Sequence, residues 1–138
     1  LTLAAFIYID QAQVNRGLID RAGSYGLYLT DGRVQCRVTT DFATVQYEVA
    51  VEPDRWYHFA CTYDGGKIKL HGHGLELKPL PVEVLINGEI NDVPGEFILG
   101  RVAGDDATKL HGALDQVMVF DRALEPWQIC DLAGPLCD

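Results

Sequence analysis

The stretch that decides the fold is His111–Leu132, HGALDQVMVFDRALEPWQICDL. Its first half alternates with a period of two residues, which predicts a strand with two distinct sides. A turn follows at Asp121-Arg122. Pro126 stands where the first residue of a helix belongs, because its fixed φ suits a helix start and its missing N–H is not needed there. The stretch therefore predicts a strand, a tight turn and a short helix. The two sides of the strand are Ala113, Asp115, Val117 and Val119 against Leu114, Gln116, Met118 and Phe120.

This stretch resembles the closing strand and helix of laminin-G-like and pentraxin-like domains, whose pattern is roughly G-x-I-D-x-V-x-[IVM]-[YWF]-[DN]-R-A-L-S-x-x-E-I. Where those domains have a serine at the helix cap, this chain has Glu125, a poorer cap whose negative charge still suits the positive end of a helix. The matching positions are Gly112, Asp115, Val117, Val119, Phe120, Asp121, Arg122, Ala123, Leu124 and Ile129.

Two further stretches agree with this resemblance. Asp54–Gly65, DRWYHFACTYDG, is similar to the "G-x-W-H-H-V-A-x-T-Y-D-G" strand of the same domains, and Tyr25–Val38 resembles the hairpin that precedes it. The resemblance implies the fold of the concanavalin A-like lectins and glucanases, an all-β antiparallel two-sheet jelly-roll sandwich with one short C-terminal helix. It also implies that Trp56 and Tyr63 pack in the core and that His58 is a structural histidine with satisfied hydrogen bonds.

The size of the chain predicts one domain over residues 1–138. No apolar run approaches the roughly 18 residues of a membrane span. The chain starts at Leu1 without a basic and then apolar leader, so we expect it to be processed or cut from a longer protein. The resemblance favours cutting, because the strand that usually precedes the segment matching residues 3–10 is absent.

Strand and turn signals recur along the chain, which is typical of an antiparallel sandwich. Asp31-Gly32 and Asn87-Gly88 predict tight hairpin turns. The segment Leu75–Asp92 is longer and more strand-like than the resemblance implies. We expect it to add a hairpin or to extend one edge of a sheet.

The formal net charge of −9 limits the partners. It argues against nucleic acid, whose binding relies on Lys and Arg meeting phosphates. It also disfavours anionic membranes and strongly acidic glycans, unless a bound cation or a local basic patch intervenes. The acidic residues are spread along the chain, as on a solvated surface.

Four cysteines in a small acidic domain favour an oxidising compartment, and we expect an extracellular, cell-surface or periplasmic location. Cys36 shares a predicted strand face with two valines, and Cys61 shares one with two aromatic residues, so both point inward if those faces do. Cys130 and Cys137 are close in sequence, with a Gly-Pro turn between them. The pairs Cys36–Cys61 and Cys130–Cys137 are favoured, while free thiols and the other two pairings stay open.

Four aspartates are the candidates for binding calcium, which takes six to eight oxygen ligands. No contiguous EF-hand loop is present, and the resemblance implies scattered ligands near one rim of the sandwich. Asp115 matches a recurrent acid of the family, and its alternative role is to hold a neighbouring turn by hydrogen bonds. The candidates are Asp64, Asp105, Asp106 and Asp115.

A second candidate metal site contains His71 and His73, which are two residues apart and share one side of a predicted strand. With Glu76 they could hold Zn²⁺, Cu²⁺ or Ni²⁺. The alternative is a Gly-rich polar turn.

Sugar binding needs exposed aromatic faces beside polar groups. The exposed candidates are Tyr25, Tyr28, Tyr47 and Trp127, although Trp127 has the alternative role of sealing the helix to a sheet. No aromatic row forms a platform, so the expectation of glycan binding depends chiefly on the resemblance.

Signatures of catalysis are absent. Glucanases of this fold carry E-x-D-x-E, which places two carboxylates on one strand face, and nothing here matches it. G-x-S-x-G, H-E-x-x-H and GxGxxG are missing as well. We therefore expect a non-catalytic module of a larger secreted or surface protein that recognises a glycan, with calcium as a candidate cofactor. The alternative is a protein–protein adhesion or structural module. We expect neither nucleic acid binding nor membrane insertion.

Overall fold

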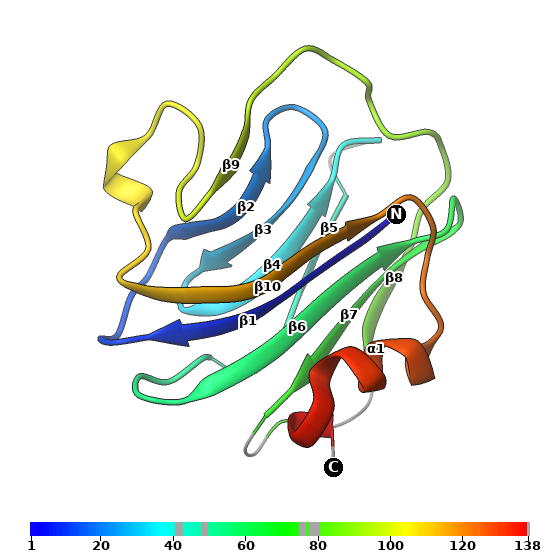
Figure 1. Ribbon diagram of the computed structural model, residues 1–138. Coiled ribbons are helices and arrows are strands. Elements are labelled where there is room, and N and C mark those ends of the chain that lie inside the picture. The colour runs from blue at the N-terminus through cyan, green and yellow to red at the C-terminus, as the bar shows by residue number, and fades with distance from the viewer. Residues whose placement is uncertain (41–42, 48–49, 75–76, 78–80, 138) are drawn as a thin grey trace.

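Two antiparallel five-stranded sheets face each other, which confirms the predicted sandwich (Figure 1). The computed structural model describes residues 1–40, 43–47, 50–74, 77 and 81–137. Sheet A has the order β10-β1-β6-β7-β8 and sheet B the order β5-β4-β3-β2-β9. The elements are β1 (Thr2–Ile9), β2 (Arg16–Arg21), β3 (Tyr25–Thr30), β4 (Arg33–Val38), β5 (Ala43–Gln46), β6 (Trp56–Tyr63), β7 (Lys67–His73), β8 (Val82–Leu85), β9 (Phe97–Leu99), η1 (Asp106–Thr108), β10 (Gly112–Phe120), α1 (Pro126–Ala133) and η2 (Gly134–Cys137).

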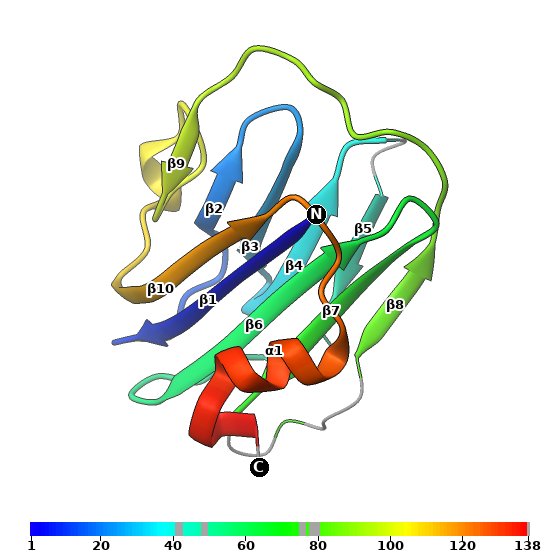
Figure 2. The same cartoon turned by 45° about the vertical axis from the view of Figure 1, so that its right-hand side comes forward.

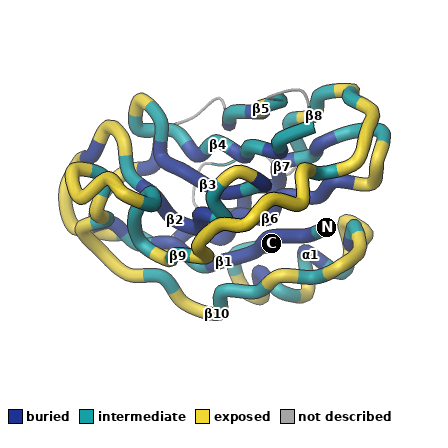
Figure 3. Tube along the Cα trace, turned by 90° about the horizontal axis from the view of Figure 1, so that it is seen from above, coloured by how far each residue is buried: buried dark blue, intermediate teal, exposed yellow. Residues whose placement is uncertain are grey.

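The main core lies between the two sheets, which Figure 3 shows from above with buried residues in dark blue. Alternate side chains of the strands point into this core. Fully burying one such side chain contributes roughly 1.5 to 3 kcal/mol, so this layer supplies the largest stabilising contribution. Side chains that are less than 2% exposed include Leu3, Ile7, Ile9, Leu27, Leu29, Phe59, Ile68 and Leu70.

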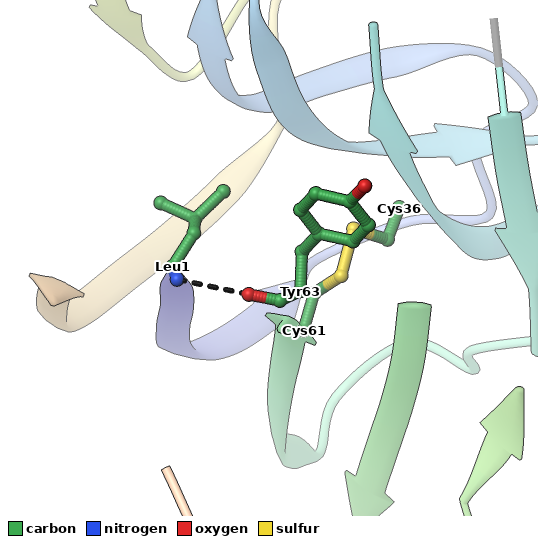
Figure 4. Close-up of a disulfide and its surroundings, with 4 residues drawn as sticks. All are labelled: Leu1, Cys36, Cys61 and Tyr63. Carbon is green, nitrogen blue, oxygen red and sulfur yellow. Dashed lines mark hydrogen bonds between the residues drawn. A yellow bond between two sulfur atoms is a disulfide. The ribbon is translucent and has the colours of Figure 1, made fainter. Parts of the chain in front are cut away.

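A disulfide crosses this core (Figure 4). It joins Cys36 in β4 of sheet B to Cys61 in β6 of sheet A, with 6.3 Å between the Cα atoms. Beside it the amino group of Leu1 donates to the Tyr63 carbonyl oxygen over 3.0 Å, and the Tyr63 side chain is buried as predicted. A second disulfide joins Cys130 in α1 to Cys137 in η2. Both favoured pairings are therefore present.

A smaller core lies on the outer face of sheet A, which α1 crosses in front of β6 and β7 (Figure 2). Ala4 and Ala60 are small enough there for Ile129 of the helix to pack on the sheet with no exposed surface. Pro126 is the first helical residue, as predicted, and the backbone N–H of Glu125 donates to Gln128 Oε1 over 2.9 Å.

Thr2 fastens the segment before α1 to sheet A. Its buried hydroxyl donates to the Arg122 carbonyl oxygen over 2.7 Å and accepts from the Leu124 N–H over 2.9 Å. Thr2→Val keeps the shape but leaves both backbone groups without this partner, so we expect a loss of about 2 kcal/mol in urea unfolding. Thr2→Ser, which keeps the hydroxyl, is the control. A Val variant as stable as the Ser variant would contradict this role.

The predicted alternation in β10 is wrong beyond Asp115, because the strand contains a β-bulge. Its register against β1 shifts there, and Gln116 has a φ of +47°. Leu114 and Val117 therefore both pack on the main core. Met118 and Phe120 pack on the smaller core beneath the helix.

The two hairpin predictions have different outcomes. Asp31 and Gly32 both have positive φ angles and join β3 to β4, as predicted. No hairpin forms at Asn87-Gly88, since residues 86–96 run without a strand from β8 in sheet A to β9 in sheet B (Figure 1). The segment Leu75–Asp92 instead supplies β8, which extends the edge of sheet A beside β7 and so confirms the other expectation.

Trp56 is not a core residue. It begins β6 opposite Tyr8, on the outer face of sheet A, and its side chain is 40% exposed. Tyr63 lies an odd number of residues further along the same strand and so faces the main core instead. The Trp56 ring packs against that of Tyr8 with 5.4 Å between the ring centroids and an angle of 45° between the ring planes.

Candidate functional site

The outer face of sheet B is polar, because the strands alternate between core and solvent. Arg33, Gln35 and Arg37 alternate along β4 with residues that are 0% exposed in the main core. Gln35 is registered with Tyr28 of β3 and with Gln46 of β5, so their side chains share this outer face. The segment that contains η1 borders the face beside β2 and β9 (Figure 1).

A chain of contacts fixes the middle of this face. The Arg37 guanidinium lies 4.5 Å above the centroid of the Tyr28 ring, and its Nη2 donates to Gln35 Oε1 over 3.2 Å. The Tyr28 hydroxyl donates to Asp20 Oδ1 over 2.6 Å, and the Ala103 N–H donates to Asp20 Oδ2 over 2.8 Å. Burial and the hydrogen bond to Asp20 raise the pKa of Tyr28. The Arg37 side chain is therefore held in one orientation over a rigid support.

Gly26 makes this arrangement possible. A Cβ at Gly26 would collide with the Tyr28 hydroxyl and with the Ile19 carbonyl oxygen. Only glycine at this position lets the Tyr28 side chain lie across β3 and reach Asp20 in β2.

Two adjoining cavities lie on this face, with volumes of about 260 and 210 Å³. Tyr28, Arg37 and Val102 border both of them. Their walls offer guanidinium, hydroxyl, carboxylate and amide groups. The remaining wall residues are Asp20, Arg21, Ala22, Gly23, Ser24, Tyr25 and Thr39 for the larger cavity and Asn15, Arg16, Leu29, Thr30 and Thr108 for the smaller one.

The four predicted aromatic residues do not gather at one place. Tyr25 and Tyr28 line the larger cavity, but Tyr28 is only 5% exposed because Arg37 covers its ring. Tyr47 is 4% exposed and packs edge-on against Phe59 in the core. The expectation that these two tyrosines are exposed is therefore wrong. Trp127 lies on α1 and is 65% exposed, so its side chain projects into solvent rather than sealing the helix.

Arg37, Gln35 and Asp20 were not predicted as site residues from the sequence. A signal for the first two was present, because polar residues in β4 alternate with Val34, Cys36 and Val38. For Asp20 there was none, since its role depends on the loop that brings the Ala103 N–H to it.

The four candidate calcium ligands lie in three places. The described residues contain no group of three or more His, Cys, Asp or Glu side chains placed to hold a metal ion. Asp64, in the turn between β6 and β7, accepts from the Gly66 and Lys67 N–H groups, and these bonds lower the pKa of its carboxyl group. Asp105 accepts from Ala107 N–H at the start of η1.

The remaining two aspartates also have partners. Asp106 lies 3.9 Å from Arg101 in an ion pair. Asp115 accepts from the Gln116 N–H over 2.8 Å at the bulge of β10. This contact agrees with the alternative role of Asp115 in holding local backbone. Calcium binding stays a prediction.

His71 and His73 do not form a polar turn but belong to β7, where they are 4% and 8% exposed. With His58, which is 1% exposed, they make a buried histidine group on the outer face of sheet A. The rings of His58 and His73 are 6.3 Å apart, and neither Nδ1 atom has a hydrogen-bond partner among the described residues. His58 is buried, but the expectation that its hydrogen bonds are satisfied is wrong, and its structural role stays a prediction. Glu76 lies outside the described residues.

Burial is the main cause of altered acidity in the buried histidine group. It lowers the pKa of His58 to about 4, with His73 adding to the effect. It lowers the pKa of His71 to about 4, with smaller contributions from His73 and Lys69. The pKa of His73 is lowered as well. All three imidazoles are therefore neutral near pH 7.

The comparison with protein families agrees with this architecture. The family model of the concanavalin A-like lectin/glucanases superfamily matches residues 1–130. The chain belongs to the concanavalin A-like lectin/glucanase superfamily. No curated protein sequence matches the chain.

Solved structures similar to this superfamily member include two from carbohydrate-related bacterial proteins. One is a Bacteroides ovatus protein provisionally assigned to carbohydrate binding, with a TM-score of 0.77 and 20% identity over 93% of this chain and 39% of that one. Another is domain 4 of AbnA, a GH43 extracellular arabinanase from Geobacillus stearothermophilus, in complex with arabinotriose. Its TM-score is 0.69 and its identity 18%, over 96% of this chain and 66% of that one.

A third similar structure is mouse laminin α1 chain domains LG4-5, with a TM-score of 0.59 and 18% identity over 91% of this chain and 38% of that one. At such identities the similarity shows the fold alone. The chain spans less than two thirds of the length of these solved structures.

Proposed function

We propose that this concanavalin A-like domain is a non-catalytic module that binds glycans on the outer face of sheet B. The observation that carries the proposal is the pair of adjoining cavities that meet at Arg37 and Val102. Saccharide sites need convergent hydrogen-bonding groups on a surface that does not rearrange. Arg37, held by Tyr28 and Gln35, and the hydroxyl group of Thr30 in the wall of the smaller cavity meet that need.

The similar structures support a binding role. One was solved with arabinotriose, and its parent enzyme is extracellular. We propose an extracellular location for this domain too, and its two disulfides are compatible with an oxidising compartment. No helix in the described part of the chain is long and apolar enough to cross a membrane.

Filling the junction of the two cavities tests the site. Val102→Phe enlarges a side chain that borders both cavities, and we expect it to weaken glycan binding at least about tenfold, since a misfit of a few atoms costs on the order of 1 to 3 kcal/mol. The measurement is binding on a glycan array, followed by calorimetry with the best saccharide. Leu85→Phe is the control, because Leu85 is 76% exposed on β8 of sheet A.

The array also separates the alternatives. If Val102→Phe and the wild type bound saccharides equally well, the binding site would lie outside these two cavities. No saccharide binding by the wild type, together with association to an extracellular protein, would favour the adhesion role instead. Repeating the array with EDTA tests whether calcium assists binding.

A further inference from the structure

The walls of the two cavities are basic although the chain as a whole is acidic. The sequence has 20 acidic residues against 11 Lys and Arg, with a net charge of −9. The charged residues in the cavity walls are Arg16, Arg21, Arg37 and Asp20. Three guanidinium groups against one carboxylate leave a local charge of +2 even when Asp20 is ionised. The residues of the cavity walls therefore carry a net charge opposite in sign to that of the whole chain.

These three arginines are held by neutral oxygen atoms. Arg16 Nη1 donates to the Asn15 carbonyl oxygen over 2.7 Å, and its Nε donates to Gln13 Oε1 over 3.2 Å. Arg21 Nη2 donates to the Val93 carbonyl oxygen over 2.9 Å. Neutral acceptors fix the orientation of a guanidinium group without cancelling its charge.

Carboxylate partners are used elsewhere. The five ion pairs among the described residues involve the cations Arg33, Arg55, Lys67, Lys69 and Arg101, and none involves the three arginines of the cavity walls. The single carboxylate in the walls, Asp20, is 5% exposed and already accepts from the Tyr28 hydroxyl and the Ala103 N–H. Among the described residues, the guanidinium groups of Arg16, Arg21 and Arg37 are thus not paired with any carboxylate in an ion pair.

We infer that the ligand of this site is an anionic saccharide, with a carboxylate or sulfate group placed against Arg37 between the two cavities. This inference rests on the proposed function and narrows it to one class of glycan. A guanidinium group presents parallel N–H donors that match both oxygens of a carboxylate or sulfate, and such charge-assisted bonds are roughly twice as strong as neutral ones. Arg16 and Arg21 border one cavity each and lend further positive charge on either side.

The test is calorimetry of the whole domain with matched pairs of saccharides. The first pair is trigalacturonate and its carboxyl-reduced neutral form, and the second is a sulfated oligosaccharide and its desulfated form. We expect one charged member to bind at least about tenfold more tightly than its neutral counterpart, and raising NaCl from about 50 to about 500 mM to reduce that preference. The two pairs distinguish a carboxylate ligand from a sulfate ligand.

Variants of Arg37 place the effect at this site. Arg37→Met is expected to remove the preference for the charged saccharide, and Arg37→Lys to restore only part of it, because lysine keeps the charge but not the paired donors. Arg122→Gln, which alters an exposed arginine outside both cavities, is expected to leave it unchanged. Thermal unfolding of each variant verifies that it folds.

The possible failures differ from one another. Equal or tighter binding of the neutral saccharides would overturn the inference and leave the proposed function standing. A charge preference that Arg37→Met retains would also overturn it. No binding of any saccharide, charged or neutral, would overturn the proposed function as well.

Discussion

Lowering the pH from 7 to 4 is expected to remove about 5 kcal/mol of the free energy of unfolding, because the folded protein keeps its buried histidine group neutral. The ordinary pKa of a histidine is about 6.5. In the fold, burial lowers the pKa of His58 and of His71 to about 4. Below pH 6.5 the unfolded chain therefore binds protons that the folded chain does not, and stability falls.

The ordinary and the lowered pKa values set both the direction of the stability change and the pH range in which it occurs. The contribution is complete above about pH 6.5 and is lost as the pH falls toward 4, at roughly 2 to 3 kcal/mol for each of the two histidines. Two backbone hydrogen bonds hold the pKa of the Asp64 carboxyl group below its ordinary value of 3.8. The stability that is lost when Asp64 is protonated therefore disappears at a lower pH than the histidine contribution. Urea unfolding at intervals between pH 7 and pH 4 measures the slope.

Single substitutions assign this slope to residues. His58→Gln and His71→Gln should each remove the uptake of about one proton on unfolding. Each should therefore lower the slope of the free energy of unfolding against pH by about 1.4 kcal/mol per pH unit. His111→Gln is the matched control, because His111 is exposed. The explanation fails if the two buried-site variants keep the slope of the wild type, whatever their stability at pH 7.

Removing the disulfide between the sheets should have the second large effect. Cys36→Ala with Cys61→Ala opens a loop with a sequence separation of 25, and we expect a loss of about 3.5 kcal/mol from the entropy gained by the unfolded chain. Because both half-cystines are at most 1% exposed, the emptied space in the core adds to this loss. Denaturant unfolding without added reductant measures the change.

The other disulfide gives the comparison. Cys130→Ala with Cys137→Ala opens a loop with a separation of only 7, for which the same relation gives about 2.5 kcal/mol at most. It ties α1 to η2 at the surface, so part of that loss is confined to local fraying. We therefore expect the disulfide between the sheets to stabilise the fold more than the surface disulfide does. A larger loss of unfolding free energy from the Cys130 and Cys137 variant than from the Cys36 and Cys61 variant would contradict this expectation.

The sandwich could be predicted because its strands carry local signals, whereas its irregularities depend on distant partners. The stretch ending in Pro126 contains a period of two, a turn and a helix start, all readable from neighbouring residues. The bulge at Gln116 has no such signal, because it is set by how β10 meets β1. The Asn87-Gly88 pair is a short-range signal, and the crossing of the chain to sheet B overrides it.

The candidate site was harder to predict, since alternation tells which residues share a face but not which face meets solvent. Tyr47 shares a face with Val45, and both lie in the core. His71 and His73 alternate with Gly72, which leaves room on the inner face for the rings of Phe59 and Tyr47. Their own outer face belongs to the side of sheet A that α1 crosses, so imidazoles that look polar in sequence are buried.

The bulge in β10 also bears on whether the edges of the sheets can pair with a second molecule. A sheet edge offers a ladder of unpaired N–H and C=O groups that can recruit a strand from another molecule. The edge strands β5, β8 and β9 comprise four, four and three described residues, too short for a long ladder. β10 has nine, but the extra residue at Gln116 interrupts the even spacing of its backbone groups. Along the edge strands that the structure describes, a neighbouring molecule would therefore find no long uninterrupted template on which to start a fibril.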